Sequence, residues 1–501
     1  MKDNSMKWLA MFLKKLIRAQ TATALGATLL VAAILAGCAV GPDYKRPETQ
    51  VTPEFRGPAA AGTNSLADLP WWTLFQDPVL LGLIQESLTN NYDLRQAVAV
   101  VEQARQQVTV ARAPLFPQLG YSGGIARGKN QVFGSSAAGL GSTSTTPYAW
   151  GLASWEIDLW GRIRRLSQAA QAQYLATVEG ERNVRLTLVS DLASAYLQVL
   201  SLRDELIIQR EATNAYAETL RIFQDRLQGG VTSRLETDRA EASLARAAST
   251  IPDLQRRIVA AENALNLLVG RPPGSVAAAE KPINQQTLVA PEIPAGLPSD
   301  LLQRRPDISA AEQQLIASSA LIGAAKANFF PQISLTGMFG QGSLEMDAFT
   351  GGSSRIWSIA AGVTGPIFQG GQIRAQYAAS KAAYDQSVAV YEQTVLNALR
   401  EVSDSLVARQ KFIEVRIESE KAVLALISSV RIATERYING RSSYFEVLEA
   451  QQQLYPTQVE LNNARLAEAR AIVDLYRVLG GGWNLTNAAA WTEPKAPATL
   501  P

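Results

Sequence analysis

The sequence predicts an α+β membrane protein in which several chains share one β-barrel, and long helices continue that barrel outside the membrane. Three observations lead to this prediction. The 501-residue chain repeats one unit twice. Each unit carries two alternating segments of membrane-strand length, about 9–11 residues. Each also carries a helical pattern far longer than the average globular helix of about 11–12 residues.

The amino terminus has the pattern of a secretory signal followed by a lipid attachment site. Basic residues lead into an uncharged apolar run from Ala22 to Ala36, which is too short to cross a membrane as a helix. Cys38, the one cysteine of the chain, follows Leu-Ala-Gly as in a bacterial lipobox. We predict a signal peptide at residues 1–37 and a covalent lipid such as palmitate on Cys38. Cys38 is followed by Ala39 rather than by aspartate. By resemblance to the sorting of bacterial lipoproteins, this favours the outer membrane over the inner membrane. A buried free thiol after an ordinary signal peptide is the alternative.

Composition argues against an enzyme. The chain has no histidine, which excludes Ser-His-Asp and Cys-His nucleophiles and histidine metal sites. The stretch GGIARGKN at Gly123 to Asn130 lacks the Ser or Thr that a phosphate-binding loop needs, and we interpret it as a loop between strands. The net charge of +2 does not indicate a nucleic-acid partner. We therefore expect no catalytic residues, no metal site and no cofactor, although carboxylate or lysine catalysis stays formally open.

Two copies of one unit make up most of the chain. ARAPLFPQL at Ala111 recurs as AKANFFPQI at Ala325, and RLQGGVTSRLE at Arg226 recurs as RYINGRSSYFE at Arg436, about 210 residues later in each case. A Pro-rich stretch separates the copies. The expected organisation is a lipidated N-terminal segment at 38–79, a first repeat at 80–270, a linker at 271–298, a second repeat at 299–482 and a tail at 483–501.

Each repeat is expected to begin with a helix, at about Leu80 to Arg112 and about Ser299 to Asn328. A Pro-Gln dipeptide ends each one, because proline cannot continue a helix. Two strands follow in each copy. The first strand is predicted to have its apolar positions at Leu119, Tyr121 and Ile125. The second has Tyr148, Trp150 and Leu152, then Trp155, Ile157 and Leu159 after a slip of one position. The third has Ile333, Leu335 and Phe339, and the fourth has Trp357, Ile359, Ala361 and Val363. Aromatic residues near the strand ends are typical of membrane strands, but a soluble four-stranded sheet has the same alternation.

A very long helix, a short turn and a return helix complete each copy. From about Gly161 to Leu227 no proline interrupts the pattern, which gives roughly 100 Å of helix. Residues in both copies step by four and three, as in a heptad seam. In the first copy the seam is predicted at Leu188, Leu192, Ala195, Val199, Leu202 and Leu206, and Tyr216, Leu220, Phe223 and Leu227 keep its register. In the second copy it is predicted at Val423, Ile427, Val430, Thr434 and Tyr437. A long soluble coiled-coil hairpin is the alternative.

Four membrane strands cannot stand alone in lipid. An open sheet would leave backbone groups unpaired, and bacterial barrels begin at eight strands. We therefore expect the chain to share a barrel with other copies. Three chains would supply twelve strands, and their helices would form a second barrel in line with the first.

At this point the chain resembles the TolC outer-membrane factor family, in its OprM-like lipoprotein efflux branch. The resemblance rests on CAVGPDYKRP at Cys38, WWTLFQDPVL at Trp71, SWEIDLWGR at Ser154, RYINGRSSYFEVLEAQQQL at Arg436 and LYRVLGGGW at Leu475. It implies a homotrimer with a 12-stranded β-barrel in the outer membrane of a Gram-negative bacterium, a periplasmic α-helical barrel and a mixed equatorial region. It further implies a passive exit duct in a tripartite efflux pump, joined by a periplasmic adaptor to an inner-membrane transporter of the RND type.

The resemblance also implies a gate at the periplasmic end, where the family closes through acidic rings and tyrosine contacts. The matching residues are Tyr437, Glu446, Glu449 and Glu236. Glu446 and Glu449 share one helical face, and in a trimer each would form a ring of carboxylates that attracts cations. Alternatively, they are solvated residues at a helix start, where negative charge is favourable. The adaptor is expected at the two turns, on Gly229, Gly230, Val231, Thr232, Ser233, Asn439, Gly440, Arg441, Ser442 and Ser443.

Two other functions stay open at this point. A lipid-anchored trimeric coiled-coil scaffold would have the helices without a channel. A periplasmic adaptor would also be lipidated, but it carries one helical hairpin per chain, whereas this sequence predicts two. The sequence does not indicate which substrate is transported.

Overall fold

The computed structural model describes residues 39–49, 55–56, 77–129, 143–277, 301–343 and 347–481. The predicted signal peptide, Cys38, most of the linker and the tail lie outside these residues. The chain divides into two compact units. The first contains the strands with the helical segments next to them, residues 102–176 and 312–390, together with the N-terminal segment. The second contains the remaining helical residues.

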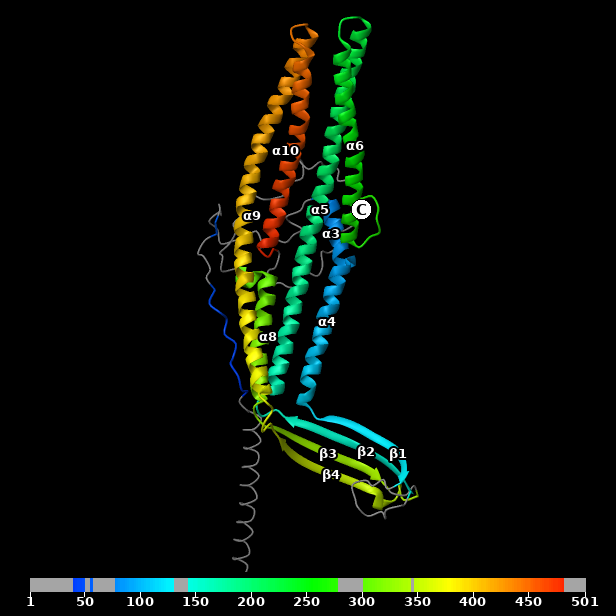
Figure 1. Ribbon diagram of the computed structural model, residues 1–501, viewed down its shortest axis with the longest axis vertical. Coiled ribbons are helices and arrows are strands. Elements are labelled where there is room, and N and C mark those ends of the chain that lie inside the picture. The colour runs from blue at the N-terminus through cyan, green and yellow to red at the C-terminus, as the bar shows by residue number, and fades with distance from the viewer. Residues whose placement is uncertain are drawn as a thin grey trace, which may run out of the picture. The chain divides into compact units, whose positions relative to one another are not determined.

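The described residues form long helices and one sheet, in the order that the sequence predicts (Figure 1). The elements are α3 (Pro78–Asn90), α4 (Tyr92–Arg112), η2 (Ala113–Leu115), β1 (Gln118–Lys129), β2 (Thr143–Ile157), α5 (Arg162–Gln228), α6 (Arg234–Val269), α7 (Leu301–Arg304), α8 (Pro306–Ala327), β3 (Gln332–Gly342), η5 (Gly352–Ser354), β4 (Arg355–Thr364), α9 (Gln372–Ile438) and α10 (Tyr444–Val478).

The two repeats have the same order of α-helices and strands. The long helices α5 and α9 each have 67 residues, and the return helices α6 and α10 have 36 and 35. In Figure 1, α5 with α6 and α9 with α10 form antiparallel hairpins. Helix α5 begins where the Asp158 carboxylate accepts the N–H groups of Ile163 at 3.1 Å and Arg164 at 2.9 Å, which satisfies free donors at the helix start.

The first helix of each repeat is broken, where the sequence predicted one continuous helix. Asn91 separates α3 from α4, and its side chain accepts the N–H of Leu94 at 2.9 Å while donating to the Leu268 carbonyl at 2.8 Å. In the second copy α7 ends at Arg304 and α8 starts at Pro306. The break falls at Arg305 because the residue before a proline is disfavoured in helical conformation.

The strands form one antiparallel sheet in the order β1-β2-β3-β4. The pairing register places an apolar set on one face: Leu119, Tyr121, Ile125, Trp155, Ile157, Ile333, Leu335, Phe339, Trp357, Ile359 and Val363. The other face is more polar and carries Ser122, Tyr148, Trp150, Leu152, Ser154, Ser334, Thr336, Met338 and Ser358.

The register explains the slip in the sequence pattern of β2. The strand is continuous from Thr143 to Ile157, and Tyr148, Trp150 and Leu152 lie on the polar face, whereas Trp155 and Ile157 lie on the apolar face. Tyr148 and Trp150 stack there with ring centroids 4.6 Å apart. The predicted loop at Gly123 to Asn130 is wrong, because β1 continues to Lys129.

The heptad seam is largely confirmed. In the first copy Leu188, Leu192, Val199 and Leu202 are buried. In the second copy Ile427 is 46% exposed, and Leu426 packs instead against the cluster around Val423. The predicted seam was therefore wrong at this position of α9. Across the described helices, none is both long enough and apolar enough to cross a membrane.

Candidate functional site

The two turns between long and return helices have the same backbone geometry. In the first, the N–H of Val231 donates to the Arg226 carbonyl at 2.9 Å, and in the second Arg441 donates to Arg436 at 2.8 Å. Gly230 and Gly440 have φ of 69° and 68°, the left-handed conformation that closes a Schellman motif. The ten residues predicted to contact the adaptor lie at these turns, exposed or half-buried.

An aromatic cluster next to the turns joins the two hairpins. Phe223 of α5 is 1% exposed and meets the Tyr444 ring edge-on, with centroids 4.3 Å apart. The Tyr444 ring also packs against the Tyr437 ring, with centroids 5.3 Å apart. The Tyr444 hydroxyl donates to Thr219 Oγ1 at 2.9 Å. Burial raises the pKa of Tyr444 to about 12, so this hydroxyl stays protonated at neutral pH.

Tyr437 makes a cation–π contact and a hydrogen bond with Arg226 of the other repeat. The guanidinium carbon of Arg226 lies 4.5 Å from the Tyr437 ring centroid, and its Nη1 donates to the tyrosine hydroxyl. The structure thus places the predicted gate tyrosine in a contact between α5 and α9. The sequence analysis did not single out Arg226 or Tyr444, and it placed Phe223 only in the heptad seam. Arg226 nevertheless begins one of the repeated motifs and corresponds to Arg436.

The predicted acidic residues do not form one cluster within the chain. Glu446 and Glu449 line a groove of about 570 Å³ between α9 and α10, together with Arg436. Arg436 Nη1 lies 3.8 Å from Glu446 Oε2, and both side chains are about half exposed, so this pair contributes little to stability. Glu236 is exposed in the first turn of α6, in the other hairpin.

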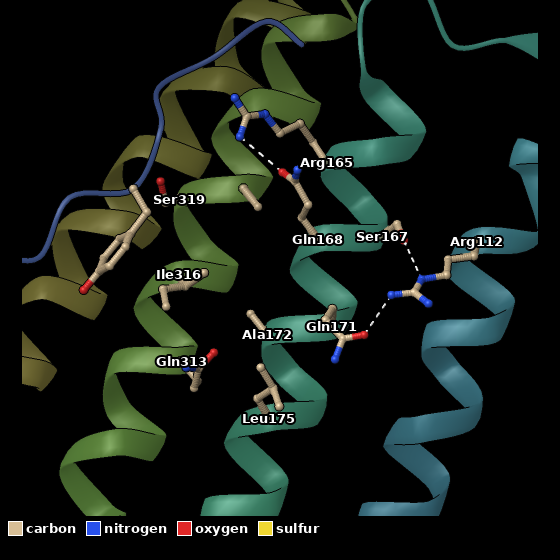
Figure 2. A pocket seen from close by; sticks show the side chains of 12 residues that line it. Arg112, Arg165, Ser167, Gln168, Gln171, Ala172, Leu175, Gln313, Ile316 and Ser319 are labelled. Atoms are coloured by element: carbon tan, nitrogen blue, oxygen red, sulfur yellow. Dashed lines mark hydrogen bonds between the residues drawn. The ribbon is translucent and has the colours of Figure 1, made fainter. Parts of the chain in front are cut away.

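The first unit has a smaller cavity of about 310 Å³ between α4, α5 and α8 (Figure 2). Arg112 donates from Nη2 to Gln171 Oε1 at 2.9 Å, and Arg165 donates to Gln168 Oε1 at 3.2 Å. Arg165 also pairs with Asp43 of the N-terminal segment at 2.9 Å. Within the described residues, no group of three or more cysteine, aspartate or glutamate side chains could hold a metal ion.

Comparison with known proteins decides the family. The model of the family described as "Outer membrane efflux protein" matches residues 83–271 and 297–481. The chain belongs to the outer membrane efflux protein family. It is 36% identical over 459 residues to the probable efflux pump outer membrane protein TtgC of Pseudomonas putida, covering 91% of this chain and 94% of that protein.

Other members of the outer membrane efflux protein family are similarly close. The outer membrane protein OprJ of Pseudomonas aeruginosa is 35% identical over 463 residues, covering 91% of this chain and 95% of OprJ. The crystal structure of the open state of the MtrE outer membrane channel of Neisseria gonorrhoeae superposes with a TM-score of 0.80 at 31% identity, covering 89% of this chain and 98% of MtrE.

As a member of this family, the chain is an outer-membrane channel of an efflux pump that extends into the periplasm, and it is a transport protein rather than an enzyme. The predicted TolC-like fold, with four antiparallel strands and long helices, is confirmed. The internal duplication is also confirmed, because the family model matches in two segments. An efflux pump component works with further pump proteins.

Proposed function

We propose that three copies of this chain form the exit duct of a tripartite efflux pump. The duct conducts substrates passively from a periplasmic adaptor and an RND-type inner-membrane transporter to the outside of a Gram-negative bacterium. A 12-stranded barrel crosses the outer membrane, a helical barrel spans the periplasm, and a lipid on Cys38 holds each chain in the membrane.

The sheet carries this proposal. It has an apolar face and two unclosed edges, β1 and β4, in the described chain. On the apolar face Leu119, Tyr121 and Ile359 are more than 80% exposed, which suits contact with lipid. Unpaired edges are not tolerated in lipid, so the sheet must close with the sheets of other copies.

The lipid anchor, the adaptor surface and the substrate are proposed from sequence and from position in the fold. The lipid is supported by Leu-Ala-Gly-Cys at the end of the apolar run. The two exposed turns are offered as the adaptor surface. The substrate follows the partner transporter, since relatives are named for pumps of toluene and of cations.

A gate at the same end as the turns completes the proposal. Tyr437 and Arg226 hold the two hairpins of one chain together, and Glu446 and Glu449 of three copies would form two rings of carboxylates. Glu236 would add a third. Such rings favour cations over anions.

Single-channel recording in planar bilayers tests the duct and its gate. The wild-type trimer is expected to give small cation-selective steps, and Glu446→Ala/Glu449→Ala should give larger and less selective steps. Glu414→Ala/Glu418→Ala is the matched control, because these exposed glutamates also lie in the α9–α10 repeat and pair with lysines on α9. Steps unchanged by the first pair would reject the acidic gate. Trimers that neither insert nor conduct would reject the duct in favour of a coiled-coil scaffold.

A further inference from the structure

We propose that the apolar face of the sheet binds a phosphorylated glycolipid of the outer leaflet, one for each chain. An acyl chain of this lipid lies in a trough on β2 and β3, and its head group carries two phosphates, one bound by Arg127 and one by Arg355. This inference rests on the proposed barrel, because the barrel presents the apolar face of the sheet to the lipid of the outer membrane. The lipid is a separate molecule from the acyl groups proposed on Cys38.

The trough has a volume of about 750 Å³ and lies on the apolar face of the sheet. Its walls are large apolar side chains that are 65–83% exposed, and small residues lie between them. The walls are Leu119, Phe339, Trp357 and Ile359, and the floor is Gly151, Ala153 and Gly337. An acyl chain in such a trough is in contact on three sides, whereas on a level sheet it is in contact on one side.

The glycine on the trough floor at β2 is not required by packing within the chain. A Cβ added to Gly151 would lie 3.8 Å from the Phe339 carbonyl oxygen and 3.9 Å from that of Gly120, which are ordinary contacts. Glycine inside a strand weakens the strand, and it often marks a place that a ligand approaches closely. The small residue at position 151 is therefore explained by the space that it leaves on the lipid side of the sheet.

Two arginines lie on the same face at the height of lipid head groups. Arg127 is nine residues after Gln118, where β1 begins, and Arg355 is nine residues before Thr364, where β4 ends. Nine residues of a strand rise about 30 Å, or about 23 Å along the membrane normal at a tilt of about 40°. This height is close to that of the apolar band of a membrane barrel, about 25 Å, so both arginines reach the far head-group region.

That region belongs to the outer leaflet. Helix α4 precedes β1 and helix α9 follows β4, so the helices join the sheet at the Gln118 and Thr364 ends of these strands. The helices extend into the periplasm, and the two arginines therefore lie at the opposite, outer end. Phosphorylated glycolipid forms the outer leaflet of a Gram-negative outer membrane, whereas phospholipid lies in the inner leaflet.

The spacing of the arginines fits a head group with two phosphates. Arg355 is in register with Gln341, Ala149 and Gly123, so it lies three strands and four residues away from Arg127. This places the two Cα atoms about 20 Å apart, too far for one phosphate to bind both side chains. Both side chains are exposed, and in the described part of the chain neither forms an ion pair with a carboxylate. Arginine binds phosphate through paired N–H groups.

Native mass spectrometry of the purified full-length trimer, titrated with diphosphoryl lipid A in detergent, tests the site. We expect wild-type protein to bind one lipid A per chain. Arg127→Gln/Arg355→Gln should bind about tenfold more weakly, because it loses the charged hydrogen bonds to both phosphates. Gly151→Leu, which fills the trough, should weaken binding by a similar factor. Monophosphoryl lipid A should bind wild-type protein with an affinity between those of the wild-type and double-variant proteins for diphosphoryl lipid A.

Two matched variants serve as controls. Arg105→Gln/Arg374→Gln removes two exposed arginines from α4 and α9, outside the sheet. Gly120→Leu adds the same side chain as Gly151→Leu, but on the polar face, where an added Cβ meets no atom within 4 Å. Both controls should bind lipid A as wild-type protein does.

Three results would overturn the lipid site. The first is equal affinity in wild-type protein and Arg127→Gln/Arg355→Gln, and the second is equal affinity in Gly151→Leu and Gly120→Leu. The third is binding of lipid A only to Cys38→Ser protein, which would show that the acyl groups of the chain itself occupy the trough. A trimeric mass without bound lipid A would reject this site and leave the proposed duct standing. A monomeric mass would reject the proposed trimer.

Discussion

At the scale of single residues, the contact between Arg226 and Tyr437 is a direct link between the two repeats at the proposed gate, beside the contacts of Tyr444 with Phe223 and Thr219. It combines a guanidinium 4.5 Å from the ring centroid with a hydrogen bond to the phenolic oxygen. A cation–π contact and a hydrogen bond each contribute about 1 kcal/mol. Together these interactions are strong enough to favour the state in which α5 and α9 stay in contact, and weak enough to let the two helices separate.

Removing this link should open the channel. Tyr437→Phe keeps the ring under the cation and removes the hydrogen bond, so we expect a small rise in open probability. Arg226→Ala removes both interactions and should shift the opening equilibrium by about 2 kcal/mol per chain, a larger rise. Single-channel open probability measures both variants.

Arg221→Ala serves as the control for this prediction. Arg221 lies one turn and a residue earlier on the same helix, is 61% exposed in its side chain and pairs with Glu218 and Asp225 of α5 itself. Exposed pairs of this kind contribute little. An open probability that rises equally in Arg221→Ala and Arg226→Ala would show that loss of charge, rather than the tyrosine contact, is responsible.

At the scale of elements, substitution by alanine is expected to change stability in opposite directions at two glycines of one long hairpin. Gly230 adopts φ of 69° in the turn, and a Cβ added there meets no atom within 4 Å. Gly230→Ala should therefore destabilise the hairpin by about 1–2 kcal/mol through the left-handed conformation alone. Gly180 lies inside α5, where an added Cβ also meets nothing, so Gly180→Ala should stabilise by about 0.5–1 kcal/mol.

Unfolding by denaturant, followed through the helical signal in circular dichroism, gives the change in the free energy of unfolding for Gly230→Ala and for Gly180→Ala. Gly440→Ala in the second turn is expected to match Gly230→Ala, because its φ is 68° and its surroundings are equally open. Equal signs for Gly180→Ala and Gly230→Ala would contradict the backbone argument, since nothing else distinguishes these sites sterically.

The elements also show how far the sequence determines the structure. Periodic patterns predict the long helices, the turns and the apolar faces of β1, β3 and β4, because these depend on residues close in the chain. The break at Asn91 was not predicted, because it depends on a bond to Leu268, a residue far along the sequence. The contact of Phe223 with Tyr444 escaped prediction for the same reason, whereas Tyr437 was found through family resemblance.

At the scale of the whole molecule, the N-terminal segment connects the proposed lipid anchor to both repeats. Asp43 binds the buried Arg165 of the first repeat at 2.9 Å. Glu312 of the second repeat accepts hydrogen bonds from the Tyr44 hydroxyl at 2.9 Å and from Arg46 Nε at 2.7 Å. The Glu312 side chain is only 13% exposed, so its charge depends on these donors. Residues 39–49 are thus tied to the repeats immediately after the predicted acylated cysteine.

Weakening this tie should release the segment without unfolding the channel. Glu312→Gln keeps the shape of the side chain and removes its charge, at a cost of about 1–2 kcal/mol. Trypsin cleavage after Lys45 should then accelerate about 5–30-fold, because cleavage follows the population of the released segment. Glu102→Gln, at an exposed glutamate that pairs with Arg105 on its own helix, should leave the rate unchanged. Equal cleavage in wild type and Glu312→Gln, with unaltered thermal unfolding, would mean that Asp43 and Arg165 hold the segment by themselves.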